Sequence, residues 1–157
     1  MAFQNSIYTT QGLGKPGTIA RLNPLEAIPV VAEGDNVFAG GFVFVGTDPE
    51  TQVIGPSADT AAKTADDVAG VAVFEKYQIG LTFDASLQIR AGETLAKVRR
   101  GYVYVMSTTA SEYGQKVFVN PSTGEIQTAA AAPEGFIDTG WVVETGNAAK
   151  QPCEIRK

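Results

Sequence analysis

The sequence predicts an all-β domain: a β-sandwich or jelly-roll-like fold of eight to ten short strands, with an extended irregular N-terminal arm. Short apolar, β-branched runs recur at a spacing of roughly ten residues, which is typical of a sandwich or barrel. The 17 glycines and 8 prolines supply turns between these runs. Glycine and proline also interrupt every regular period near the N-terminus. We therefore expect an arm over residues 1–27 and a single β-domain over residues 28–157.

The first half of the predicted domain holds three clear strands. Residues 27–32 are expected to form a short edge strand, because Pro29 has no N–H group to donate to a neighbour. Residues 42–45 are apolar on both faces, so we expect that strand to be covered on both sides. Residues 46–66 are loop-like, with room for one or two helical turns, and a further strand is expected over residues 68–74.

The second half alternates between apolar runs and turns. A turn over residues 120–124 predicts a hairpin, and Trp141 is expected in the core. Lys97 and Arg99 alternate with Val98, so we expect both to lie on one solvent-facing side of a strand. The expected runs are residues 81–89, 95–99, 101–106, 116–119, 125–128, 135–144 and 153–156.

Charge argues against nucleic acid as a partner. The net charge is −5, and phosphate binding needs clustered Lys and Arg. The charge is uneven, because residues 48–75 contain six acidic residues against Lys63 alone, whereas Lys15 and Arg21 precede the first acid, Glu26. The basic arm and the acidic loop could bind each other between copies, or bind a shell surface, by charge complementarity. The alternative is that the acidic loop is simply solvated.

The sequence offers no catalytic apparatus, and we expect no enzyme activity. It has no histidine and one cysteine, Cys153, which excludes Ser–His and Cys–His pairs, ordinary structural zinc and an intrachain disulfide. Carboxylates are scattered, and the twelve-residue calcium-loop spacing is absent, although Asp48, Glu50, Asp66 and Asp67 carry suitable oxygens. We therefore expect no metal and no cofactor.

The sequence also predicts no membrane association. It lacks a signal-peptide pattern and a run of roughly 20 apolar residues. We therefore expect the chain to be made and folded in a cytoplasm.

The arm is the strongest candidate for function. It is too apolar for an ordinary solvated tail, so Phe3, Ile7 and Tyr8 are candidate anchors on a partner. Lys15 and Arg21 would orient the contact by charge. The glycines that would permit close approach of the backbone are Gly12, Gly14 and Gly17. The alternative is a disordered or self-packed tail.

Several sequence features occur together in this arm: MAFQ at residues 1–4, QGLGKPGTI at residues 11–19, and Pro24 and Pro29. In this order they resemble the N-terminus of tailed-bacteriophage capsid cement, or decoration, proteins. The resemblance is specific over about the first 30 residues and diffuse beyond residue 37. It implies a structural virion protein that is made in the cytoplasm of a bacterial host, binds the outer capsid surface and stabilises it by bridging subunits of the major capsid protein. It also implies self-association, as a homodimer or a homotrimer.

A second interpretation is a carbohydrate-binding β-sandwich module. Tyr102 and Tyr104 share one face of a predicted strand and could form an exposed platform for a sugar or for another copy. They could equally belong to the core. The sequence leaves open the strand order, the choice between dimer and trimer, the host, and whether the exposed surface also binds host glycans.

Overall fold

The structure, a computed structural model, describes residues 14–73 and 87–157 and confirms an all-β fold there. Arm residues 1–13 and part of the predicted run 81–89 lie outside the described residues. Within them there are eleven strands and two 3-10 turns, η1 (Ala58–Thr60) and η2 (Ala65–Asp67), where helical turns were predicted. The strands are β1 (Ile19–Ala32), β2 (Val37–Phe38), β3 (Phe42–Val45), β4 (Gln52–Ile54), β5 (Val68–Val73), β6 (Gln88–Ile89), β7 (Thr94–Met106), β8 (Lys116–Val119), β9 (Ile126–Ala129), β10 (Ile137–Thr145) and β11 (Pro152–Arg156).

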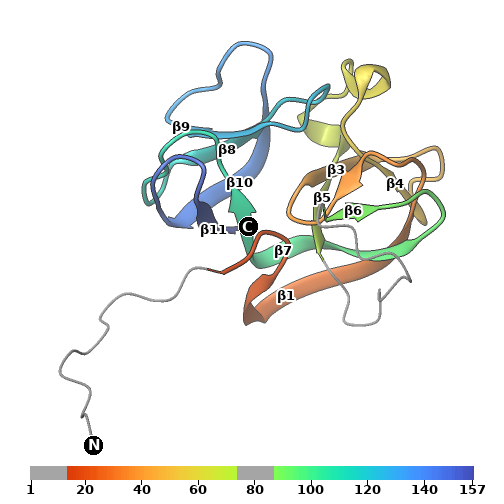
Figure 1. Cartoon of the computed structure of the whole chain (residues 1–157), viewed down its shortest axis with the longest axis horizontal. Helices are drawn as coiled ribbons and strands as arrows, with labels where there is room; N and C mark the ends of the chain where they lie inside the picture. Colours follow the sequence, from red (N-terminus) through yellow and green to blue (C-terminus); the bar gives the residue numbers. More distant parts are fainter. Residues whose placement is uncertain (1–13, 74–86) are drawn as a thin grey trace, which may run out of the picture.

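The main sheet has two parts that share β7 (Figure 1). In the first part, β1, β4, β3, β5 and β7 close into a ring, because β1 pairs with β4 in parallel and with β7 antiparallel. In the second part, the sheet continues from β7 through β11, β10 and β8 to β9. We call these parts the ring and the wing. Their apolar faces pack together as a sandwich-like domain, as the sequence predicted.

Two apolar clusters correspond to this arrangement. The ring interior contains Val43 of β3 and Leu95 of β7, together with Val37 and Ile89 from the small β2–β6 sheet. The second cluster lies between ring and wing and includes Phe42, which packs edge-on against Trp141 with ring centroids 6.3 Å apart. Phe42 and Val43 are both fully buried on opposite faces of β3, which confirms the expectation that this strand is covered on both sides.

Strand β7 connects the ring and the wing. Its first half pairs with β5 through Val98, and its second half pairs with β11 through Tyr102. The sequence predicted two runs meeting at Arg100-Gly101, but the structure keeps one strand through this point. Gly101 has φ +143°, and a Cβ there would lie 3.0 Å from the carbonyl oxygen of Pro24. Glycine therefore allows β1 to cross closely without ending β7.

Strand β1 begins earlier than predicted. Residues 19–26, expected in the arm, belong to the strand because Ile19 and Arg21 pair with Val103 and Tyr102 of β7. Among the described residues, β1 has a second neighbour only at its end, where it pairs with β4. Pro29 precedes that point, so it stands where one side of the strand is open.

Lys97 is a second correction. It is 6% exposed, whereas Arg99 faces solvent. Lys97 shares a side of β7 with Leu95, which belongs to the ring interior. Alternation correctly predicted that Lys97 and Val98 lie on opposite sides of the strand. It could not show that the side of Lys97 faces the interior of the closed ring. Burial, with the nearby charge of Arg99 as a second cause, lowers the pKa of Lys97.

Candidate functional site

The described chain begins with a segment bound to the domain, residues 14–21, which we call the arm root. The amide of Gly17 donates to the carbonyl of Tyr104 at 2.9 Å, and the amide of Tyr104 donates to the carbonyl of Thr18 at 3.0 Å. The sequence produces this geometry locally, because Pro16-Gly17 forms a tight turn in which the Thr18 amide donates to the Lys15 carbonyl at 3.1 Å. Gly17 has φ +82°, typical of the third position of a type II turn. The point where residues 1–13 join is therefore fixed on β7.

Close approach of glycine, predicted for a partner surface, occurs here within the chain itself. A Cβ on Gly14 would lie 2.1 Å from a ring carbon of Tyr104, so only glycine fits against that ring. A Cβ on Gly17 would lie 2.8 Å from the Cβ of Ala39. These two glycines let the arm root lie flat on the domain.

Charged groups hold the other end of the arm root. The Arg21 Nε donates to the carboxylate of Glu154 at 2.8 Å, and Arg21 Nη2 lies 3.5 Å from Glu144. Glu144 also pairs with Arg156 at 2.6 Å. Thr145 Oγ1 donates to the second oxygen of Glu154 at 3.1 Å. Both oxygens of Glu154, which is 1% exposed, therefore have partners.

The arm root covers the two predicted tyrosines. The Arg21 guanidinium lies over the ring of Tyr102, 4.4 Å from its centroid, in cation–π geometry. The hydrogen bond to Glu154 is the main reason that the pKa of Arg21 is raised. Burial, with the charge of Glu154 as a second cause, raises the pKa of Tyr104. Both tyrosines are half-buried and contact the arm root, Tyr102 through Arg21 and Tyr104 through Gly14. They therefore form no open aromatic platform in this structure.

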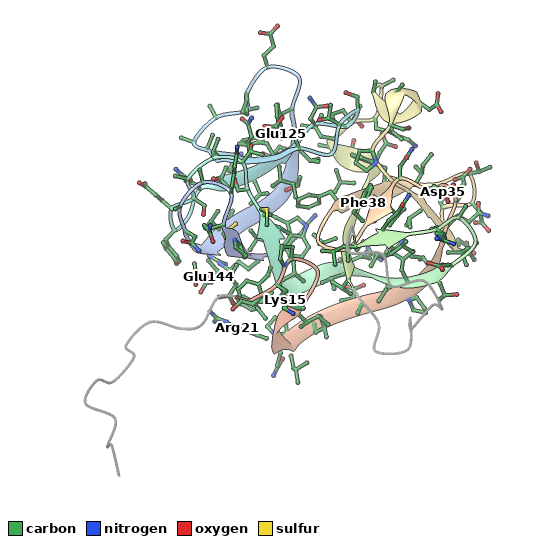
Figure 2. All side chains as sticks on the ribbon, in the orientation of Figure 1. Lys15, Arg21, Asp35, Phe38, Glu125 and Glu144 are labelled. Atoms are coloured by element: carbon green, nitrogen blue, oxygen red, sulfur yellow. The ribbon has the colours of Figure 1, made fainter. Side chains whose placement is uncertain are left out.

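The structure thus brings together five of the predicted site residues: Gly14, Gly17, Arg21, Tyr102 and Tyr104. Lys15 is exposed beside them, on the same side of the molecule as Arg21 and Glu144 (Figure 2). The remaining predicted arm residues, Phe3, Ile7, Tyr8 and Gly12, lie outside the described residues.

Sequence reasoning missed Glu144, Glu154 and Arg156. Glu154 is separated from Arg21 by 133 positions, so no local spacing could join them. The available signal was an acid placed between Cys153 and Ile155 in an apolar run, since a charged group within such a strand needs a partner when it is buried.

Some of the acidic residues between β3 and β5 accept hydrogen bonds from neighbours in the same loop. The Asp48 carboxylate accepts from the Thr51 hydroxyl, and Asp67 accepts from the Thr64 amide. These hydrogen bonds lower the pKa of both carboxyl groups.

Over residues 14–73 and 87–157, no three acidic or cysteine side chains gather as a metal site. In the same ranges, no helix is long and apolar enough to cross a membrane.

Comparison with known proteins gives a family match over almost the whole chain. The family described as structural cement protein (E217 gp24/Pam3 gp6) matches residues 3–157. No curated protein matches the sequence. A chain from the capsid of Myoviridae phage XM1 shares the fold, with a TM-score of 0.68 over 99% of this chain and 97% of that chain, at 16% identity. The head fiber gp8.5 N base of bacteriophage phi29 gives a TM-score of 0.48 at 9% identity, covering 84% of this chain and 92% of that chain.

Proposed function

This chain belongs to the phage structural cement protein family, and from that membership we propose that it binds the outer surface of a bacteriophage capsid and bridges neighbouring major capsid subunits. A capsid-associated structural role in the virion follows from the family. The outer surface, the bridging and the contact residues are our proposal. The observation that carries it is that the family match begins at residue 3 and so includes the arm together with the domain.

The arm root supports a mechanical part for the arm. A tail whose junction with the domain is loose would bind a partner but would leave the position of the domain poorly defined. Here, hydrogen bonds from Gly17 and the Arg21–Glu154 pair fasten the chain to β7 and β11. Anchors at Phe3, Ile7 and Tyr8 on one shell subunit would therefore hold the domain in a defined position over a neighbouring subunit.

Stabilisation then needs no reaction. Because the assembled shell is bound and separated subunits are not, occupancy by cement lowers the free energy of the shell by mass action. Self-association as a dimer or trimer would add effective concentration, since each further arm binds from a domain already held in place. Aromatic and aliphatic anchors suit this role because each buries a large apolar area on ordering.

The test is co-sedimentation of the purified protein with expanded shells that lack cement, together with its mass in solution. We expect saturable binding at a fixed ratio to the major capsid protein, and a dimer or trimer mass. Absence of binding by the full chain would contradict the proposed function.

The arm is tested by removing residues 2–13. The deletion stops at Leu13 because residues 14–21 are bound to β7 and belong to the fold. We expect the truncated protein to keep its β-sheet circular dichroism and cooperative melting but to lose most shell binding. The full-length variant Phe3→Ala/Ile7→Ala/Tyr8→Ala is the matched control, since it keeps chain length and should lose binding similarly. Normal decoration by both variants would show that the arm is not the anchor.

A further inference from the structure

The bulge in β1 is a feature that the arm does not explain. Arg21 pairs with Tyr102 and Glu26 pairs with Arg100, so the four residues 22–25 stand opposite Gly101 alone. The surplus residues cannot follow the pleat and must loop out of the sheet. We call the surface formed by Leu22, Pro24, Arg99 and Arg100 the bulge corner.

The two leucines of the bulge point in different directions. Leu25 packs against the cluster between ring and wing. Leu22 is 82% exposed, the highest value among the exposed large apolar side chains of the described residues. A single exposed leucine is common on protein surfaces, but this one is held outward by a bulge whose other leucine is anchored in the core.

Basic residues flank the bulge, because Arg21 precedes it and Arg100 pairs with Glu26 at its end. Arg99 is 57% exposed and lies 3.5 Å from Glu26, and Arg100 is exposed beside it. Lys15 of the arm root lies on the same side of the molecule as Arg21 (Figure 2). This side of a chain of net charge −5 therefore carries a local positive excess, because three acids stand against five basic residues. The acids are Glu26, Glu144 and Glu154, and the basic residues are Lys15, Arg21, Arg99, Arg100 and Arg156. Such a local excess favours an acidic partner.

We propose that the bulge corner is a second docking surface, which fits an acidic patch with a small apolar hollow on the outer face of a shell subunit. This inference rests on the proposed function. Its geometric support is continuity, because the bulge end of β1 and the start of the described chain lie on the same side of the molecule (Figure 1). The arm and the corner can then meet the shell together, with Leu22 filling the hollow and the arginines facing carboxylates.

A second copy of this chain fits the corner less well. The acidic loops that could receive it lie at the opposite end of the molecule, around η1 and η2 (Figure 1). Asp48 and Asp67 in those loops already accept local hydrogen bonds. Such a contact would also be head-to-tail, which allows a ring of three but not a two-fold dimer.

The test compares corner variants with matched controls in shell-binding isotherms at low and physiological salt. The variants are Leu22→Ser and Arg99→Glu/Arg100→Glu. The controls are Tyr113→Ser, at an apolar side chain 71% exposed, and Arg90→Glu, at another exposed arginine. We expect Leu22→Ser to weaken binding at least about tenfold, as for an interface anchor. The charge reversal should weaken it at low salt and flatten its salt dependence, while both controls stay within about twofold of wild type.

Three results would overturn the inference. If both corner variants bind shells like wild type while the arm variants lose binding, the corner is not an interface and the proposed function stands. If the wild-type chain binds no shells, both proposals fail. If the corner variants bind shells normally but lose the solution dimer or trimer in sedimentation, a second copy occupies the corner. Thermal melting of each variant confirms that the fold is intact.

Discussion

The two ends of β1 both pair with β7, but different interactions hold them in place. From Ala27 to Val31 the strand pairs residue for residue with Thr94–Val98, and Val30 lies in the ring interior beside Leu95. From Ile19 to Ala27 the register shifts three times, and the ion pair of Arg21 with the buried Glu154 of β11 takes over from apolar packing. Apolar packing stabilises without strict geometry, whereas paired charges fix one position because any other leaves a carboxylate unpaired. The ring end thus stabilises the fold, and the arm-root end sets where the arm leaves it.

The largest expected effect lies at the ring end. Leu95 is fully buried, and Leu95→Ala should destabilise the whole domain by about 3 kcal/mol, through lost transfer energy and the cavity left behind. Chemical denaturation followed by tryptophan fluorescence measures this, because Trp141 is buried in the neighbouring cluster. Leu22→Ala is the control, since its side chain is exposed and its loss should change stability by less than about 0.5 kcal/mol. Equal effects of the two substitutions would break the comparison.

The next effect distinguishes the two partners at the arm root. Arg21→Met leaves the buried carboxylate of Glu154 with Thr145 alone, and should lower the melting temperature by about 5 °C. Glu154→Leu removes the buried charge and leaves Arg21, whose side chain is 44% exposed, to be solvated. It should therefore change the melting temperature much less. Differential scanning calorimetry provides both values.

Local opening sharpens this result. Both variants should speed hydrogen exchange at the amides of Gly17 and Tyr104, which hold the arm root, and leave the ring amides near Val30 protected. The double variant Arg21→Met/Glu154→Leu should regain most of the stability lost in Arg21→Met. A larger loss in Glu154→Leu than in Arg21→Met would show that packing, and not the unpaired charge, dominates this end.

The sequence predicted whatever depends on local spacing. Alternation placed Phe42 and Val43 on opposite buried faces, and it placed Trp141 in the core. It could not show that ring closure turns Lys97 inward, because that depends on which strand lies beside β7. Pairing of Arg21 with Glu154 was hidden for the same reason. The glycines of the arm root were predicted to permit close approach to a partner, and sequence alone could not show that Gly14 lies against Tyr104 of the same chain.

The smallest effect concerns an exposed carboxylate just beyond the ring end of β1. Glu33 accepts hydrogen bonds from the hydroxyl and the amide of Thr47, and the hydroxyl is the main reason that the pKa of Glu33 is lowered. A lowered pKa stabilises the fold above the usual glutamate pKa of about 4.3, and this stabilisation is lost as the pH falls through the folded-state value. Thr47→Val should therefore lower the melting temperature at pH 7 by roughly 1 °C, since exposed interactions of this kind are weak. The two melting curves should converge on acidification. Melting from pH 7 to pH 2.5 measures this, and a difference that persists at low pH would mean that Thr47 acts by packing. Glu33 is exposed, so water can replace Thr47 as its hydrogen-bond partner, whereas Glu154 is buried and depends on Arg21 and Thr145. Because of this difference in burial, Glu154 fixes the position of the arm root and Glu33 contributes little to the stability of the fold.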